Sequence, residues 1–216
     1  MRRSHSHAHW KGLHFLTVPG LHGSGPGHWQ TRWEARFPAW GRVTQADWSR
    51  PSLPIWAAAV GRAVRAAPRP VVLVAHSFGC LASLRWALND PAGIAGALLV
   101  APAEPDKFAV ADQMPVARLP FPTVVVASRD DPWMQQRNAF TWGTLWGSEL
   151  VDAGRLGHIN ADSGLGDWED GLGLLGGLVQ RIEGPAALQP LQSASERALA
   201  WAPCPQVSPM PYSWNV

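Results

Sequence analysis

Short unbroken apolar runs recur along the chain, separated by stretches in which apolar residues return every three or four positions. The runs that predict strands cover residues 13–18, 71–75, 94–103 and 122–131, with weaker candidates at 42–47 and 148–154. A strand that is apolar at every position is typical of a parallel sheet covered on both faces, because both of its sides are buried. The pattern therefore predicts an α/β fold with three layers: a mostly parallel central sheet and helices on both faces.

Helices are predicted between these runs from the spacing of their apolar residues. The predicted segments cover residues 28–38, 53–68, 80–88 and 167–183. Trp29, Trp33 and Phe37 follow one another at four-residue intervals, which places them on one helix face. The second segment has Pro54 in its first turn and ends at Pro68. Both positions are expected, because proline is tolerated in the first turn of a helix and ends it elsewhere.

The composition agrees with one globular domain. The 216 residues are 46% hydrophobic and 16% charged with a formal net charge of +2, which excludes a disordered chain and argues against a nucleic-acid partner. We expect a flexible N-terminus at 1–12, the folded domain at 13–183 and a Pro-rich tail at 184–216. The longest apolar stretch is about half as long as a membrane span, and the basic start lacks an adequate hydrophobic region. We therefore predict a cytoplasmic protein with no membrane partner.

The clearest motif is Ala75-His76-Ser77-Phe78-Gly79, between a predicted buried strand and a predicted helix. A serine in a tight strand-to-helix turn is pushed clear of the sheet, so this context is that of a nucleophile elbow. The strand and the helix cross closely there, which requires small residues two positions before and two positions after the serine. Ala75 and Gly79 meet that requirement, with alanine in place of the more usual glycine. The alternative is an ordinary strand-turn-helix with an incidental serine.

A serine nucleophile needs a base, and the base needs an acid that orients it. In the hydrolase order the acid follows a later strand and the histidine lies in a late loop. His158 is the only histidine after the elbow, while Asp130 and Asp131 both follow a predicted strand. We favour Asp131 because it precedes Pro132 and begins the next turn, whereas Asp130 is suited to bonding loop amides. Ser77, Asp131 and His158 are therefore the candidate catalytic residues.

The reaction also needs hydrogen-bond donors for the oxyanion of the tetrahedral intermediate. The backbone amide of Phe78, directly after the serine, is one candidate. The second is expected from the glycine-rich loop after the first strand, where Leu21 is favoured and His22 is the alternative.

Other kinds of chemistry are not favoured by the sequence. In a P-loop, Lys-Ser/Thr would follow Gly25, but Pro26-Gly27 stands there, and a dinucleotide fingerprint would need glycine in place of His28. Cys80 and Cys204 do not make a disulfide scaffold, and Cys80 is interpreted as a buried structural thiol. No residues have the spacing of a zinc site, and the histidines near the N-terminus fit a disordered basic start. We predict no metal and no cofactor.

Four motifs together resemble the small α/β-hydrolase family of retinoblastoma-binding protein 9 and its bacterial relatives. They are a His-Trp pair after the glycine-rich loop, a histidine before the elbow serine, an Asp-Asp-Pro acid loop and a late Gly-His, all within residues 13–183. The resemblance implies an α/β-hydrolase fold and a Ser-Asp-His triad at the three residues named above. Ala75, Ala127 and the C-terminal tail depart from the family pattern. The Leu-x-Cys-x-Glu motif is absent, so a retinoblastoma partner is not implied.

These residues predict a serine hydrolase for a small-molecule acyl substrate, acting on a carboxylic ester, an amide or a thioester through an acyl-enzyme. Only a short segment separates the strand near Ala101 from the run at Pro122, so no large cap domain fits and the site should be shallow. The aromatic residues that could wall an acyl pocket are Trp29, Phe78, Phe108 and Trp133. Two alternatives keep the same fold: a non-catalytic interaction module and an acyltransferase. The sequence leaves the choice between monomer and homodimer open.

Overall fold

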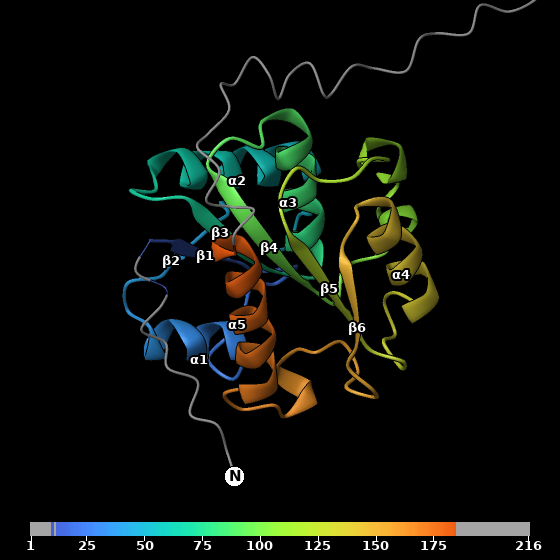
Figure 1. Cartoon of the computed structure of the whole chain (residues 1–216). Coiled ribbons are helices and arrows are strands. Elements are labelled where there is room, and N and C mark those ends of the chain that lie inside the picture. The colour runs from blue at the N-terminus through green and yellow to red at the C-terminus, as the bar shows by residue number, and fades with distance from the viewer. Residues whose placement is uncertain (1–9, 11, 185–216) are drawn as a thin grey trace, which may run out of the picture. The chain divides into compact units, whose positions relative to one another are not determined.

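A computed structural model describes residue 10 and residues 12–184, and a parallel sheet of six strands lies at its centre (Figure 1). The strands are β1 (His14–Val18), β2 (Gly41–Arg42), β3 (Val71–His76), β4 (Ile94–Val100), β5 (Thr123–Ala127) and β6 (Glu149–Asp152). Their order is β2-β1-β3-β4-β5-β6, and all neighbouring pairs are parallel. The connections from β1 and β3 leave toward opposite edges of the sheet. Ligands of open α/β sheets bind at the carboxyl ends of strands that diverge in this way.

Helices cover both faces of this sheet and complete the three predicted layers. The helices α1 (Trp29–Arg36) and α5 (Glu169–Glu183) lie on one face, and α2 (Leu53–Ala66), α3 (Phe78–Asn89) and α4 (Gln136–Leu145) lie on the other (Figure 1). Each face has its own apolar cluster, one with α1 and α5 and one with α2, α3 and α4. The predicted α/β architecture with helices on both faces is therefore confirmed.

The central strand β3 shows why the strand segments are apolar at every position. All six of its residues are buried. Val72 and Val74 pack in the cluster under α1 and α5, whereas Leu73 and Ala75 pack in the cluster under α2 and α3. Because successive side chains point to opposite faces, a strand between two helical layers has no polar side.

The sequence pattern misplaces some element boundaries. The strand predicted at 42–47 is shorter in the structure, where β2 covers only Gly41–Arg42. Val43 donates one further bond to the Thr17 carbonyl (2.9 Å), and the chain then leaves the sheet edge. The run at 122–131 ends as a strand at Ala127. The helix α4 is not predicted at all, since only Ala139 and Gly143 of its ten residues are buried and no apolar stripe forms.

The segment between β4 and β5 holds two short 3₁₀ turns, Pro105–Phe108 and Ala111–Gln113, and no inserted domain. A large cap is therefore absent from this connection, as predicted. The predicted flexible N-terminus and Pro-rich tail fall almost entirely outside the described residues. Within the described part of the chain, no helix combines the length and the apolar character needed to cross a membrane.

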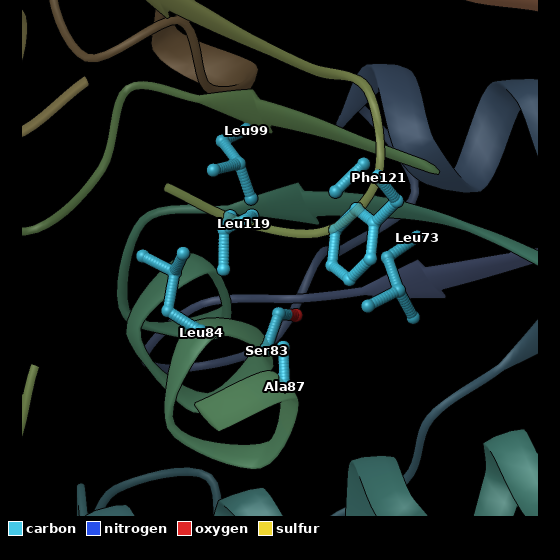
Figure 2. A pocket seen from close by; sticks show the side chains of 8 residues that line it. Leu73, Ser83, Leu84, Ala87, Leu99, Leu119 and Phe121 are labelled. Carbon is cyan, nitrogen blue, oxygen red and sulfur yellow. The ribbon is translucent and has the colours of Figure 1, made fainter. Parts of the chain in front are cut away.

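A narrow gap lies between α3 and the sheet (Figure 2). It is lined by Leu73, Ser83, Leu84, Ala87, Ala97, Leu99, Leu119 and Phe121. It has no room for a water molecule, and its one hydroxyl, on Ser83, already donates to the Gly79 carbonyl at 2.8 Å. The gap is a packing feature of the core and offers a ligand no free polar group.

Candidate active site

The turn between β3 and α3 holds Ser77 in a strained conformation. Its backbone has φ 53° and ψ −124°. Residues other than glycine rarely adopt this conformation, and those that do are concentrated at functional sites. The chain crosses so closely that a Cβ on Gly79 would lie 2.2 Å from the Val18 carbonyl oxygen, and a Cβ on Gly20 would lie 2.6 Å from Ser77 Cβ. Glycine is therefore required at position 79 by the backbone at the end of β1, and at position 20 by Ser77 itself.

Ser77, His158 and Asp131 meet at the carboxyl ends of their strands. His158 Nε2 lies 2.9 Å from Ser77 Oγ, and His158 Nδ1 lies 3.0 Å and 2.9 Å from the two carboxylate oxygens of Asp131. A carboxylate can only accept, so Nδ1 carries the proton and Nε2 accepts the hydroxyl proton of the serine. The His158 side chain is 10% exposed and that of Asp131 3% exposed, so little water screens the pair.

Asp130 is placed differently from its neighbour. Its Oδ1 accepts from Ser128 Oγ at 2.8 Å and from the Gly157 amide at 3.0 Å, and these bonds, the Ser128 bond foremost, lower the pKa of the Asp130 carboxyl. Ser128 Oγ in turn accepts from the Leu156 amide at 2.9 Å. Asp130 therefore braces the loop that carries His158, and Asp131 contacts the imidazole.

The two predicted oxyanion donors follow residues at the elbow: Phe78 comes directly after Ser77, and Leu21 comes directly after Gly20. Phe78 opens α3, so its amide has no acceptor within the helix, and the Leu21 amide follows Gly20, which packs against Ser77. Neither amide donates to another residue within positions 12–184. The His22 amide, by contrast, donates to the Trp48 carbonyl at 2.8 Å and is not available. The geometry favours Leu21 over His22.

The four aromatic candidates for the pocket wall divide between core and surface. Trp29 and Phe78 are 1% and 0% exposed and belong to the core, and Phe108 packs on Phe78 at a ring-centroid distance of 4.9 Å. Trp133 is 49% exposed, with its ring centroid 6.2 Å from that of His158. Of the four, Trp133 presents an exposed apolar surface beside His158.

Two buried histidines, His28 and His76, lie next to the site and were not among the predicted catalytic residues. The His76 ring lies 4.7 Å from the His28 ring and 4.9 Å from the His158 ring, measured between centroids. Burial lowers the pKa of His76 well below its usual value, and burial, followed by Arg42, lowers the pKa of His28 to about 4. Both rings are therefore neutral at pH 7. The only sequence signal for them is their position, beside Trp29 and directly before Ser77.

Other reactive groups do not compete with the serine. Cys80 is fully buried, and burial raises the pKa of its thiol far above the usual value, so it stays protonated. Among the described residues, no three His, Cys, Asp or Glu side chains are grouped so that they could hold a metal ion.

The sheet order, the elbow and the site define a small α/β hydrolase, and comparisons with known proteins agree. The sequence pattern of the serine hydrolase family matches residues 15–177. The chain therefore belongs to the serine hydrolase family. A solved structure of a YdeN-like hydrolase from Pectobacterium atrosepticum is 42% identical, with a TM-score of 0.79 over 81% of this chain and 95% of that chain.

More distant structures share the fold. The ydeN gene product of B. subtilis is 20% identical with a TM-score of 0.62 over 77% of this chain and 97% of its own. The esterase RhEst1 from a Rhodococcus species is 13% identical with a TM-score of 0.59 over 80% of this chain and 92% of its own. None of the curated proteins matches the chain.

Proposed function

We propose that the protein is an esterase in which Ser77 attacks the carbonyl carbon of a small acyl substrate. The observation that carries this proposal is the 2.9 Å contact between Ser77 Oγ and His158 Nε2, with the far nitrogen of the same ring on the Asp131 carboxylate. His158 takes the serine proton as the new C–O bond forms, and Asp131 stabilises the imidazolium.

The remaining steps use the same groups. The amides of Leu21 and Phe78 donate to the oxyanion of the tetrahedral intermediate. His158 then gives its proton to the leaving alcohol, and the acyl group stays on Ser77. Water attacks this acyl-enzyme with His158 again as the base, which releases the acid and restores the serine. No step requires a metal or a cofactor.

The proposed substrate is an ester. Solved structures that share the fold include the esterase RhEst1 and the RedJ thioesterase, and both names are those of hydrolases of acyl groups. The buried histidine before the serine, the His-Trp pair and the Asp-Asp-Pro loop support a place near the relatives of retinoblastoma-binding protein 9. If the acyl-enzyme transferred its acyl group to an added alcohol in place of water, the protein would be an acyltransferase that uses the same intermediate.

Active-site labelling tests the proposal directly. The protein is treated with a fluorophosphonate probe, the labelled peptide is located by mass spectrometry, and hydrolysis of p-nitrophenyl acetate is followed in parallel. We expect the label on Ser77 and its loss in Ser77→Ala. Ser83→Ala is the matched control, because Ser83 lies in α3, which begins directly after Ser77, and its hydroxyl donates to the Gly79 carbonyl. Labelling that persists in Ser77→Ala, or its absence from the natural protein, would overturn the proposal.

A further inference from the structure

Two consecutive carbonyl groups in the His158 loop accept hydrogen bonds from side chains that are far from this loop in the sequence. The His158 carbonyl oxygen lies 2.9 Å from Nε2 of His76, and the Ile159 carbonyl oxygen lies 2.8 Å from Nε1 of Trp29. A carbonyl oxygen can only accept, so both nitrogens donate, and the neutral His76 carries its proton on Nε2. The backbone that carries the base is therefore held by hydrogen bonds at two consecutive residues, His158 and Ile159.

The backbone of this segment is strained at Ile159. Ile159 has φ 48°, in the left-handed region that strains a residue with a side chain, and it is fully buried. Such a conformation persists only where surrounding contacts enforce it. The two side-chain donors supply contacts of that kind at the residue that bears the imidazole and at the residue after it.

Both donors are themselves fixed. His76 is 5% exposed and Trp29 is 1% exposed, so neither ring can turn away into water. His76 ends β3 and precedes Ser77, so the segment that orients the nucleophile also holds the base. Trp29 begins α1, packs on Trp33 and Trp168, and has its ring centroid 6.3 Å from that of His76.

We propose that His76 and Trp29 are positioning residues, whose N–H groups hold the His158 loop so that the imidazole keeps its alignment between Ser77 and Asp131. This inference rests on the proposed esterase function, because it assigns the pair a role in that reaction. Both hydrogen bonds go to backbone carbonyls and not to the imidazole or the serine hydroxyl. Small displacements of catalytic groups by distant changes cost about 100-fold in rate, so loss of one donor should appear in kcat.

A pair of tryptophans in α1 offers a matched test. Trp33 lies one turn after Trp29, is also fully buried, and donates its Nε1–H to the Asp167 carbonyl at 2.6 Å. Trp29→Phe and Trp33→Phe therefore remove the same group from the same helix, and only the first frees the His158 loop. We expect Trp29→Phe to lower kcat on p-nitrophenyl acetate about 10- to 100-fold with KM within about twofold. Trp33→Phe should keep kcat within about twofold while Tm falls similarly in both variants.

His76 is tested by replacement with and without a donor. His76→Gln keeps an N–H at similar reach and should retain most of kcat, whereas His76→Leu should lose about 10- to 100-fold. In the natural protein the His158 Nδ1 proton should give a downfield NMR resonance, which His76→Leu and Trp29→Phe should weaken and Trp33→Phe should leave unchanged.

The outcomes separate the two proposals. If the natural protein hydrolyses the ester while Trp29→Phe and Trp33→Phe lose equal activity, the tryptophan bond is only structural and the positioning role is overturned. Equal activity of His76→Gln and His76→Leu overturns the positioning role of His76. If Ser77 of the natural protein is unreactive, the esterase proposal fails and the positioning role falls with it.

Discussion

The carboxylate of Asp131 accepts the Nδ1–H of His158 at 2.9 Å, while the adjacent Asp130 points to the amide of Gly157. Two neighbouring carboxylates thus act on one loop in different ways. One faces the imidazole and the other holds the backbone amide of the residue directly before His158. Their side chains diverge because Asp131 begins a turn, in which its Oδ1 also accepts from the Trp133 amide at 2.9 Å.

Substitution of the two aspartates should therefore have unequal effects. We expect Asp131→Asn to lower kcat by about 10⁴, because the amide favours the wrong tautomer of His158. Asp130→Ala should lower Tm and leave kcat within about tenfold, because the loop loses one brace but the imidazole keeps its partner. Kinetics on p-nitrophenyl acetate with melting curves check both expectations. A larger loss in Asp130→Ala than in Asp131→Asn would reverse the assignment.

Two glycines of the β1–α1 loop provide a second comparison. A Cβ on Gly20 would lie 3.2 Å from Ser77 Oγ as well as against Ser77 Cβ, whereas a Cβ on Gly25 would meet nothing within 4 Å. Gly20→Ala should lower kcat/KM about 100-fold, because the serine or the Leu21 amide must move. Gly25→Ala should behave like the natural protein in the same ester assay. Equal activities in the two variants would mean that the loop does not contribute to the site.

Trp133 should contribute to substrate binding. Its exposed ring lies beside His158, and Lys107 Nζ lies 5.8 Å from its centroid. Trp133→Ala should raise KM for aryl esters roughly 2- to 10-fold, the effect of an aromatic contact of about 0.5–1.5 kcal/mol, with kcat little changed. Methyl esters of the same acids are the internal control, since they offer no ring to the indole. An equal rise in KM for both series would remove this role.

The acyl preference should be for short chains. The connection between β4 and β5 contains two 3₁₀ turns and no cap, so little apolar surface is available to cover a long acyl chain. Among p-nitrophenyl esters of increasing length, kcat/KM should be highest for acetate and butyrate and should fall beyond them. A maximum at long chains would contradict the shallow site.

Buried histidines should make the fold sensitive to acid. In the unfolded chain His28 has a pKa near 6.5, and in the fold it is lowered to about 4, so the unfolded state binds the proton more readily between these values. Stability is therefore fully present above about pH 6.5 and is lost as the pH falls toward 4, by on the order of 2–3 kcal/mol from this group.

Urea unfolding at pH 7.5 and pH 4.5 measures this loss, with His28→Asn for comparison. Asparagine can still cap α1, where His28 Nδ1 accepts from the Gln30 amide at 3.2 Å, but it does not titrate. The variant should lose less stability between the two pH values than the natural protein. An equal loss would show that His28 does not carry this dependence, and His76 would remain as the buried group that does.

Much of the fold and of the candidate site was predictable because the signals are local. An apolar run such as 71–75 specifies a strand buried on both faces, and Ala75 and Gly79 specify the tight crossing at Ser77. The unpredicted parts lack a local signal. Helix α4 buries only Ala139 and Gly143, so its sequence has no apolar stripe to reveal it.

The sequence by itself determined the strands, the parallel α/β arrangement, the elbow and the short list of polar residues able to serve Ser77. The sequence already favoured Asp131 over Asp130 as the partner of the imidazole, and only the tertiary structure shows that His76 and Trp29 hold the His158 loop. The physical reason is range. Trp29 and Ile159 are 130 positions apart and His76 and His158 are 82 apart, so no periodicity or spacing encodes their contact. Such bonds exist only once the sheet has brought its strand ends together.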